Sequence, residues 1–310
     1  MKAIVAGASG AIGTPLVAAL TRSGHEVIGI SRSKGGAARV EEQGAKAIIA
    51  DVLDRDSLLR AFDGASADAV IHEATALKNA PTHYRGRGIT TTNKLRTSGT
   101  GNLIDVVRLV GAKRFVMQSM IFGYGFADHG TTSITEDAPF GVPKGGKSDP
   151  AMEAFLSAEQ QACSATDIAG VALRYGFLYG PGPASARIAK MLRTKLFPIP
   201  RGEGGTLGWL HVDDAVSATV AALEHGKAGH SYNIVDDEPA TWGDVFDAMA
   251  AATGAPRPPR LPQFMLRLST PFFAEQMIDT SMRVSNAKAK SGLGWIPSKP
   301  TFRQGVASMA

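Results

Sequence analysis

The sequence predicts an α/β fold in which a parallel β-sheet is covered by helices on both faces. Three observations predict it. Short β-branched runs alternate with segments of helical apolar spacing, a glycine-rich turn follows the first run, and polar residues recur where the expected strands end. Such alternation is typical of a sheet built one parallel strand at a time. At 310 residues the chain also has room for a smaller second region.

The chain begins with an expected strand, a tight turn and a helix over residues 2–20. Glycines in such a turn let backbone N–H groups and the positive end of a helix dipole approach a pyrophosphate. The turn therefore predicts a dinucleotide site, although close packing of strand and helix is an alternative reason for the glycines. The expected cofactor contacts are Gly7, Ser9, Gly10, Ala11, Ile12 and Gly13.

The second expected strand, residues 26–30, ends at Ser31 and Arg32. A carboxylate at this place in dinucleotide-binding folds accepts a hydrogen bond from the ribose 2′-hydroxyl of NAD, and the sequence has none there. A guanidinium suits a 2′-phosphate instead. The pair predicts NADP(H) in preference to NAD(H), with an arginine that merely points into water as the alternative.

Later strands also end in residues suited to a ligand. Strands are expected at 45–50, 69–71, 114–118 and 171–173, and a long helix at 93–110. Open α/β sheets bind ligands at the carboxyl ends of their strands. We therefore expect further cofactor contacts from Asp51, Val52, Glu73, Ala74, Asn93, Ser119, Tyr175 and Gly176.

Composition narrows the class of protein. Hydrophobic residues make up 44% and charged residues 20% of the chain. The net charge is +5, and the basic residues are scattered among acidic ones. A single cysteine, Cys163, indicates a reducing compartment, and no apolar run approaches the roughly 20 residues of a membrane span. We expect a cytoplasmic protein without nucleic-acid, membrane or metal partners. Asp213 and Asp214, after His211, are expected to begin a helix rather than to bind a metal.

Two segments lack periodicity and are expected to be irregular, residues 77–91 and residues 120–150. The second contains GVPKGGKS at 141–148, which matches the phosphate-binding pattern G-x-x-x-x-G-K-[ST]. A phosphate loop of this kind needs a buried strand directly before it, and the preceding residues do not predict one. We interpret the match as accidental.

Taken together, these motifs resemble the extended or atypical short-chain dehydrogenase/reductase superfamily, of the NAD-dependent epimerase/dehydratase type. The resemblance is carried by GASGAIG at 7–13, Asp51-Val52, Asn93 with GTGNL at 99–103, Ser119, LRYGFLYGPG at 173–182, HVDD at 211–214 and the segment 288–295. It implies a Rossmann-type doubly wound sheet over residues 1–180. A smaller substrate-binding region over 181–310 follows, of which about 205–236 returns to the main domain. A homodimer through helices 93–110 and 151–165 is also implied.

The family's usual catalytic groups are a serine, a tyrosine and a lysine, the last two spaced Y-x-x-x-K. Alignment of the helix after the serine strand places Ala151 and Phe155 at the tyrosine and lysine positions. No tyrosine of the chain is followed by lysine four residues later. Ser119 is retained. Tyr124 is the first candidate for the proton donor, with Lys144 or Lys147 supplying positive charge, and an aromatic at a pocket rim is the alternative for Tyr124.

Three functions remain open at this stage. The first is an atypical NADP(H)-dependent reductase or epimerase acting on a small carbonyl or hydroxyl metabolite. The second is a catalytically silent NADP(H) sensor, and the third is a non-redox isomerase, dehydratase or cyclase. An aromatic wall for a small hydrophobic carbonyl compound, slightly favoured over a nucleotide sugar, is expected from Tyr175, Tyr179, Phe197, Trp209 and Phe264.

Overall fold

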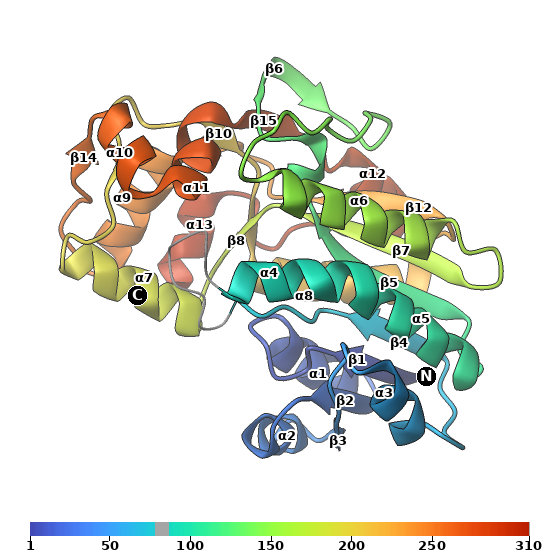
Figure 1. The fold of residues 1–310 in the computed structure, drawn as a ribbon. Helices are drawn as coiled ribbons and strands as arrows, with labels where there is room; N and C mark the ends of the chain where they lie inside the picture. The colour runs from blue at the N-terminus through green and yellow to red at the C-terminus, as the bar shows by residue number, and fades with distance from the viewer. Residues whose placement is uncertain (78–86, 310) are drawn as a thin grey trace.

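A computed structural model describes residues 1–77 and 87–309 of the chain. Its centre is a seven-stranded sheet in the order β12-β7-β5-β4-β1-β2-β3 (Figure 1), and every neighbouring pair of strands is parallel. The order reverses at β1, which is the arrangement of a Rossmann-type sheet and confirms the predicted fold class. The strands are β1 (Lys2–Ala6), β2 (Glu26–Ser31), β3 (Lys46–Ile49), β4 (Ala69–His72), β5 (Arg114–Met120), β7 (Ala169–Tyr175) and β12 (His230–Ile234).

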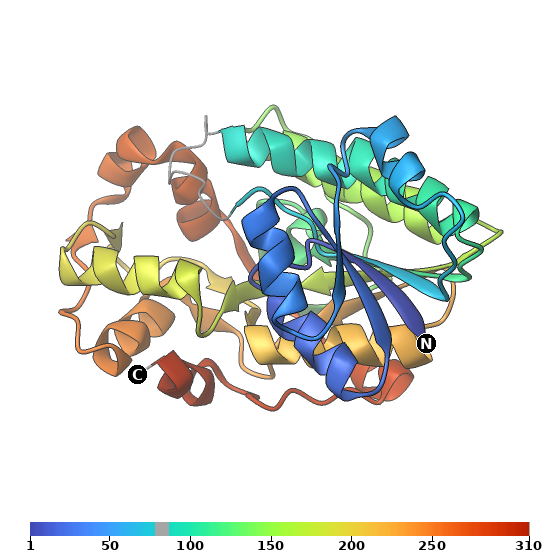
Figure 2. The ribbon, with the colours of Figure 1, turned by 90° about the horizontal axis from the view of Figure 1, so that it is seen from below.

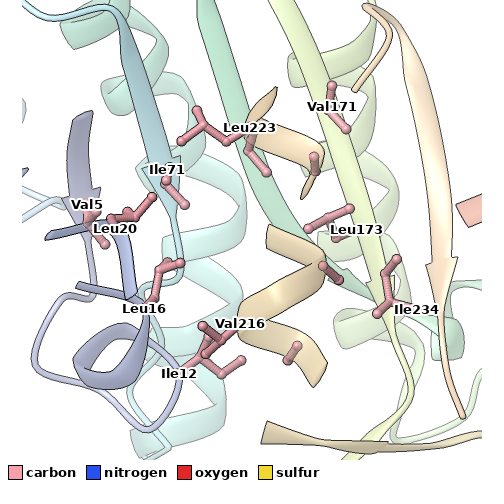
Figure 3. Close-up of a cluster of buried hydrophobic side chains, with 14 of the residues drawn as sticks. Val5, Ile12, Leu16, Leu20, Ile71, Val171, Leu173, Val216, Leu223 and Ile234 are labelled. Carbon is pink, nitrogen blue, oxygen red and sulfur yellow. The ribbon is translucent and has the colours of Figure 1, made fainter. Parts of the chain in front are cut away.

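Helices α1 (Gly13–Arg22), α8 (Val212–His225) and α12 (Ala287–Leu293) cover one face of the sheet. Their apolar side chains recur at helical spacing, so each helix buries one stripe against the alternating residues of the strands. Figure 3 shows Leu16 and Leu20 of α1 and Val216 and Leu223 of α8 in this layer. The short helix α2 (Lys34–Glu41) contributes Val40 to the same cluster.

The opposite face carries α3 (Arg55–Ala61), α5 (Thr100–Leu109) and α6 (Asp149–Cys163). The helix α4 (Arg87–Lys94) runs into α5 through a π-helical turn, η1 (Leu95–Gly99). The sheet therefore lies between two helical layers, with α5 and α6 on one side and α8 on the other (Figure 2). The side chain of Asp54 caps α3 by accepting from the backbone N–H of Ser57.

A second hydrophobic core lies beyond the carboxyl end of the sheet and is built around Trp209, Trp242 and Phe246. Its helices and short strands are α7 (Pro183–Arg193), β9 (Ile199–Pro200), β10 (Thr206–Leu207), β13 (Ala240–Thr241), α9 (Trp242–Ala252), β14 (Arg260–Leu261), α10 (Gln263–Ser269), α11 (Pro271–Ala274), η3 (Glu275–Asp279), α13 (Phe302–Val306) and η4 (Ala307–Met309). Strand β8 (Phe177–Tyr179) leads out to this region and pairs with β11 (Trp209–His211). The chain then returns through α8 to β12 before α9 begins.

Two expectations about irregular segments are partly wrong. The loop expected at 77–91 becomes helix at Arg87, while 78–86 lie outside the described residues. The segment expected to be irregular at 120–150 contains a 3₁₀ turn, η2 (Ile121–Tyr124), and strand β6 (Asp128–Ile134). The partner of β6 is β15 (Ser281–Val284), so this pairing joins distant parts of the chain and has no local signal.

The phosphate-loop pattern at 141–148 follows irregular backbone rather than a strand, in agreement with its interpretation as accidental. Among the described residues, no helix combines the length and the apolar character needed to cross a membrane.

Candidate functional site

The glycine turn connects the carboxyl end of β1 to α1 and has room for backbone atoms only. Gly7 has φ +86°, and a Cβ there would lie 2.6 Å from the carbonyl carbon of Glu73. A Cβ at Gly13 would lie 2.0 Å from the carbonyl oxygen of Gly7. No described side chain caps the start of α1 and no acidic residue lies in its first turn, so its N–H groups face no competing anion from the residues that the structure describes. The glycines therefore allow the strand and the helix to pack closely, which was the alternative reason for them. The same turn also fits a pyrophosphate.

A serine cluster lies at the end of β2. The hydroxyl oxygens of Ser9 and Ser31 are 3.5 Å apart, and a Cβ at Gly36 would lie 2.0 Å from the hydroxyl of Ser31. Ser33 caps α2 by accepting from the N–H of Gly36 at 3.2 Å. The backbone of α2 therefore approaches the predicted ribose position closely.

Arg32 is exposed beside this cluster, and so is Lys34 in the first turn of α2. Neither makes an ion pair with the residues that the structure describes. Sequence reasoning singled out Arg32 but missed Ser33 and Lys34. The sequence does carry a signal for both residues. A serine suited to capping is followed by a lysine, and the helix that begins there has no acidic residue in its first turn.

The residues after β3 are held by local bonds. Asp51 accepts from the N–H of Leu53 at 3.0 Å, which closes the turn, and its side chain is half-buried. Val52 is buried, and its carbonyl accepts from the Asn102 side chain at 2.8 Å. The turn is therefore fixed against the start of α5.

A buried polar network lies behind the glycine turn. The Tyr175 hydroxyl donates to Glu73 Oε1 at 2.8 Å and lies 2.6 Å from Thr219 Oγ1. The second Glu73 oxygen is buried without a hydrogen-bond partner among the described residues. Burial raises the pKa of Glu73 to about 8. Gly176 directly follows Tyr175, and its N–H donates to the Ile234 carbonyl at 2.9 Å, so the backbone pairing extends one residue beyond the strand.

His72 ties the end of β4 to the π-helical turn. Its Nδ1 accepts from the N–H of Ala74 at 3.2 Å, which leaves Nε2 to donate to the Leu95 carbonyl at 3.1 Å. Burial lowers the pKa of His72 to about 4, so the ring is neutral at physiological pH. The next residue of the turn, Arg96, donates to the Asn93 side chain at 3.4 Å.

Ser119 faces the α5 and α6 layer. It pairs in register with Arg174 of β7, whose side chain reaches Glu159 on α6, and paired residues of adjacent strands point to the same face. The Ser119 side chain is fully buried, and its hydroxyl has no partner among the described residues. Ala151 and Phe155 lie on the buried side of α6. An unpaired hydroxyl at a strand end fits a bound ligand.

Tyr124 lies in a tight network. Its hydroxyl accepts from Arg174 at 2.8 Å and donates to Asn233 Oδ1 at 2.8 Å. Burial raises the pKa of Tyr124 against the opposing effect of Arg174. Lys144 and Lys147 are exposed. The structure brings Tyr124 and Lys144 together, because both line a cavity of about 350 Å³.

The expected aromatic wall is not found. Tyr175, Tyr179, Phe197 and Trp209 are packed in the hydrophobic clusters, while Phe264 is 64% exposed. Aromatic side chains here fill the core, which their spacing in the sequence could not distinguish from lining a pocket.

The segment at 211–214 begins α8, as expected. The ring of His211 accepts from the N–H of Asp213 at 3.2 Å and contacts Ser308 at 2.8 Å. Asp214 accepts from the backbone of Ser298 at 2.6 Å and of Lys299 at 3.0 Å. Both carboxylates lie in the first turn of the helix.

Comparison with known proteins agrees with this geometry. The model of the NAD-dependent epimerase/dehydratase family matches residues 3–235. A 3-diazoavenalumate denitrifying reductase from a Streptomyces species is 36% identical over 317 residues, covering 99% of each chain. A 2-alkyl-3-oxoalkanoate reductase from Stenotrophomonas maltophilia is 28% identical over 334 residues, covering 96% of this chain and 95% of the other.

Among solved structures, the human epimerase family protein SDR39U1 (isoform 2) with NADPH superposes with a TM-score of 0.78 at 22% identity, covering 100% of this chain and 99% of that one. This likeness concerns the fold. The matched family model spans the glycine turn, the Ser119 strand and β12. The chain therefore belongs to the NAD-dependent epimerase/dehydratase family and is an enzyme of the oxidoreductase or epimerase type.

Proposed function

We propose that the protein is an NADP(H)-dependent reductase of a small aromatic electrophile, with an arenediazonium compound as the favoured substrate class. The observation that carries this proposal is the buried side of α6, which includes Ala151 and Phe155 but no tyrosine, lysine or histidine. The 36% identical Streptomyces relative is named as a denitrifying reductase of a diazo compound. A substrate of this kind does not require the acid that α6 lacks.

The cofactor is held, in this proposal, along the carboxyl edge of the sheet. The N–H groups of the glycine turn and of the first turn of α1 bind the pyrophosphate. Arg32, Lys34 and Ser33 surround the 2′-phosphate and favour NADP(H), while Asp51 and Val52 border the adenine. Glu73, Ala74, Asn93, Tyr175 and Gly176 border the nicotinamide half. When bound, reduced nicotinamide supplies a hydride.

The substrate class follows from the proton count. Reduction of a carbonyl to an alcohol needs a hydride and a proton, so a positioned acid accelerates it. An arenediazonium cation that accepts one hydride forms a C–H bond in place of its C–N bond and releases dinitrogen. Charge and atoms balance without a proton, so this reaction does not need the tyrosine and lysine that α6 lacks. Ser119 then orients the substrate through its hydroxyl.

The cavity lined by Tyr124 suits a substrate of this size. Phe126, Phe140 and Met152 give it an apolar and aromatic lining, with Lys144 as a cation. Its volume of about 350 Å³ is within the range of small-ligand pockets.

The test measures NADPH consumption with an arenediazonium salt, an aromatic ketone and a nucleotide sugar, each against a protein-free control for spontaneous reduction. Cofactor loss with formation of the arene and dinitrogen supports the proposal. Binding of NADPH without consumption across the panel would instead indicate the sensor or the non-redox function.

Carbonyl reduction is the second candidate, because Tyr124 has a cation, Arg174, bonded to its oxygen at 2.8 Å and shares a cavity with Lys144. In this function Tyr124 donates the proton, with Lys144 or Lys147 supplying positive charge. If the wild-type protein turns over the ketone and Tyr124→Phe does not, carbonyl reduction is favoured over reduction of the diazo substrate.

Two further expectations remain proposals. A homodimer through residues 93–110 and 151–165 is tested by light scattering coupled to size-exclusion chromatography. A cytoplasmic location is tested by fractionation of the source cells.

A further inference from the structure

A buried arginine that has no counter-ion among the described residues lies at the junction of β4, the π-helical turn and α6. Arg96 is 6% exposed, and its guanidinium carbon lies 4.0 Å from the centre of the Phe155 ring. Its hydrogen bond to Asn93 is long, at 3.4 Å, and its Nε has no partner among the described residues. No carboxylate in the described part of the chain forms an ion pair with it. Burial lowers the pKa of Arg96 to about 9.

The position of this charge follows from the strand register. His72 at the end of β4 pairs with Met117, two residues before Ser119 on the same face of β5. His72 in turn bonds to Leu95, the neighbour of Arg96. Arg96 therefore lies on the α6 side of the carboxyl ends of β4 and β5, the face to which Ser119 points.

The backbone around Arg96 departs from regular α-helix in a way that is common at functional sites. Residues Leu95–Gly99 form a π-helical turn, and such turns inside α-helices occur frequently at functional sites. An uncompensated buried charge is also costly, so a fold that keeps one has a reason to do so. An anionic or oxygen-rich ligand removes the cost when it binds.

We propose that Arg96 binds the nicotinamide half of the cofactor by donating from its guanidinium to ribose and phosphate oxygens. A dinucleotide on a Rossmann-type sheet spans both halves of the strand order. Arg32 lies at the end of β2, in the half of the sheet on the far side of β1, and Arg96 lies in the β4–β5 half. The two cations thus face opposite ends of the ligand. This inference rests on the proposed NADP(H)-dependent function.

The test compares two ligands, NADPH and 2′,5′-ADP, which is the adenine half alone. Arg96→Met is expected to weaken NADPH binding at least about tenfold and to leave 2′,5′-ADP binding unchanged, as measured by calorimetry. Arg96→Lys keeps the charge and is expected to restore part of the affinity. Arg32→Met is expected to weaken both ligands, and the exposed Arg108→Met neither.

The outcomes separate this inference from the proposed function. If the wild-type protein binds NADPH and Arg96→Met binds it equally well, Arg96 does not hold the cofactor. Equal loss of NADPH and 2′,5′-ADP in a variant with altered circular dichroism would show that Arg96 acts on the fold only. A wild-type protein that binds no nicotinamide nucleotide would overturn both proposals.

Discussion

Arg174 and Arg96 are both buried, both stack on aromatic rings and both lie against α6, yet their surroundings differ. Arg174 donates to both oxygens of Glu159, at 2.8 to 3.1 Å, and to the hydroxyl of Tyr124. Although burial opposes its charge, Glu159 and Tyr124 raise the pKa of Arg174. The guanidinium of Arg96 donates a hydrogen bond only to Asn93 among the described residues, and burial lowers the pKa of Arg96. The comparison teaches that a charge neutralised within the fold holds elements together, whereas a charge left open is available to a ligand.

The largest expected effect comes from removing the partner of Arg174. Glu159→Gln leaves an uncompensated charge in a buried site and is expected to lower the free energy of unfolding by about 3–5 kcal/mol. Urea unfolding measures this loss. The exposed Glu153→Gln on the same helix is the matched control and should stay within about 0.5 kcal/mol of wild type. A small effect of Glu159→Gln would mean that Arg174 behaves like Arg96.

A second prediction concerns a buried carboxyl that none of the described residues neutralises. Neither oxygen of Asp236 makes a hydrogen bond of normal geometry with the described residues, and burial raises its pKa to about 8, an effect that the Glu238 backbone only partly offsets. The unfolded chain loses this proton near pH 4 and the native protein near pH 8, so the native state holds more protons in between. Stability should therefore fall as pH rises through this window, by about 1 kcal/mol per unit.

Asp236→Asn removes this titration and should flatten the dependence of the unfolding free energy on pH between 5 and 8. Glu73, whose pKa is also raised to about 8, keeps part of the slope. The exposed Asp63→Asn should retain the wild-type slope. An unchanged slope in Asp236→Asn would show that this carboxyl is neutralised in solution.

Substitution of Tyr124 tests whether the hydrogen-bonded network around Arg174 also takes part in the reaction. Tyr124→Phe removes a bond from Arg174 and a bond to Asn233, and the expected loss of stability is about 1–3 kcal/mol. Turnover of an arenediazonium should be unchanged at a temperature where both proteins are folded. Loss of that turnover would contradict a reduction that needs no proton donor.

The smallest effect, and the one of opposite sign, is expected at Arg96. Arg96→Met replaces a buried cation that has no ion-pair partner in the described part of the chain by an apolar side chain, so the nucleotide-free protein should gain about 1 kcal/mol in urea unfolding. The same variant is expected to lose affinity for NADPH. A loss of stability as large as that of Glu159→Gln would contradict the contrast between the two arginines.

Local patterns predicted much of this molecule. The glycine turn at residues 7–13 and the strand that delivers Ser119 both depend on neighbouring residues, and the structure has both. The pairing of β6 with β15 joins segments about 150 residues apart, so it has no signal within either segment. The aromatic residues of the expected wall other than the exposed Phe264 are core for the same reason, because their partners come from distant parts of the chain.

By itself, the sequence determined the alternation of strands and helices, the place of the nucleotide turn and the absence of a Y-x-x-x-K pair, since these depend on residue type and short spacing. Only the tertiary structure decided which of two buried arginines meets a carboxylate. Glu159 lies fifteen residues before Arg174 in the chain and reaches it because α6 packs on β7. Arg96 packs against a ring of the same helix one turn earlier and meets no such partner among the described residues, because charge compensation depends on distances in the fold.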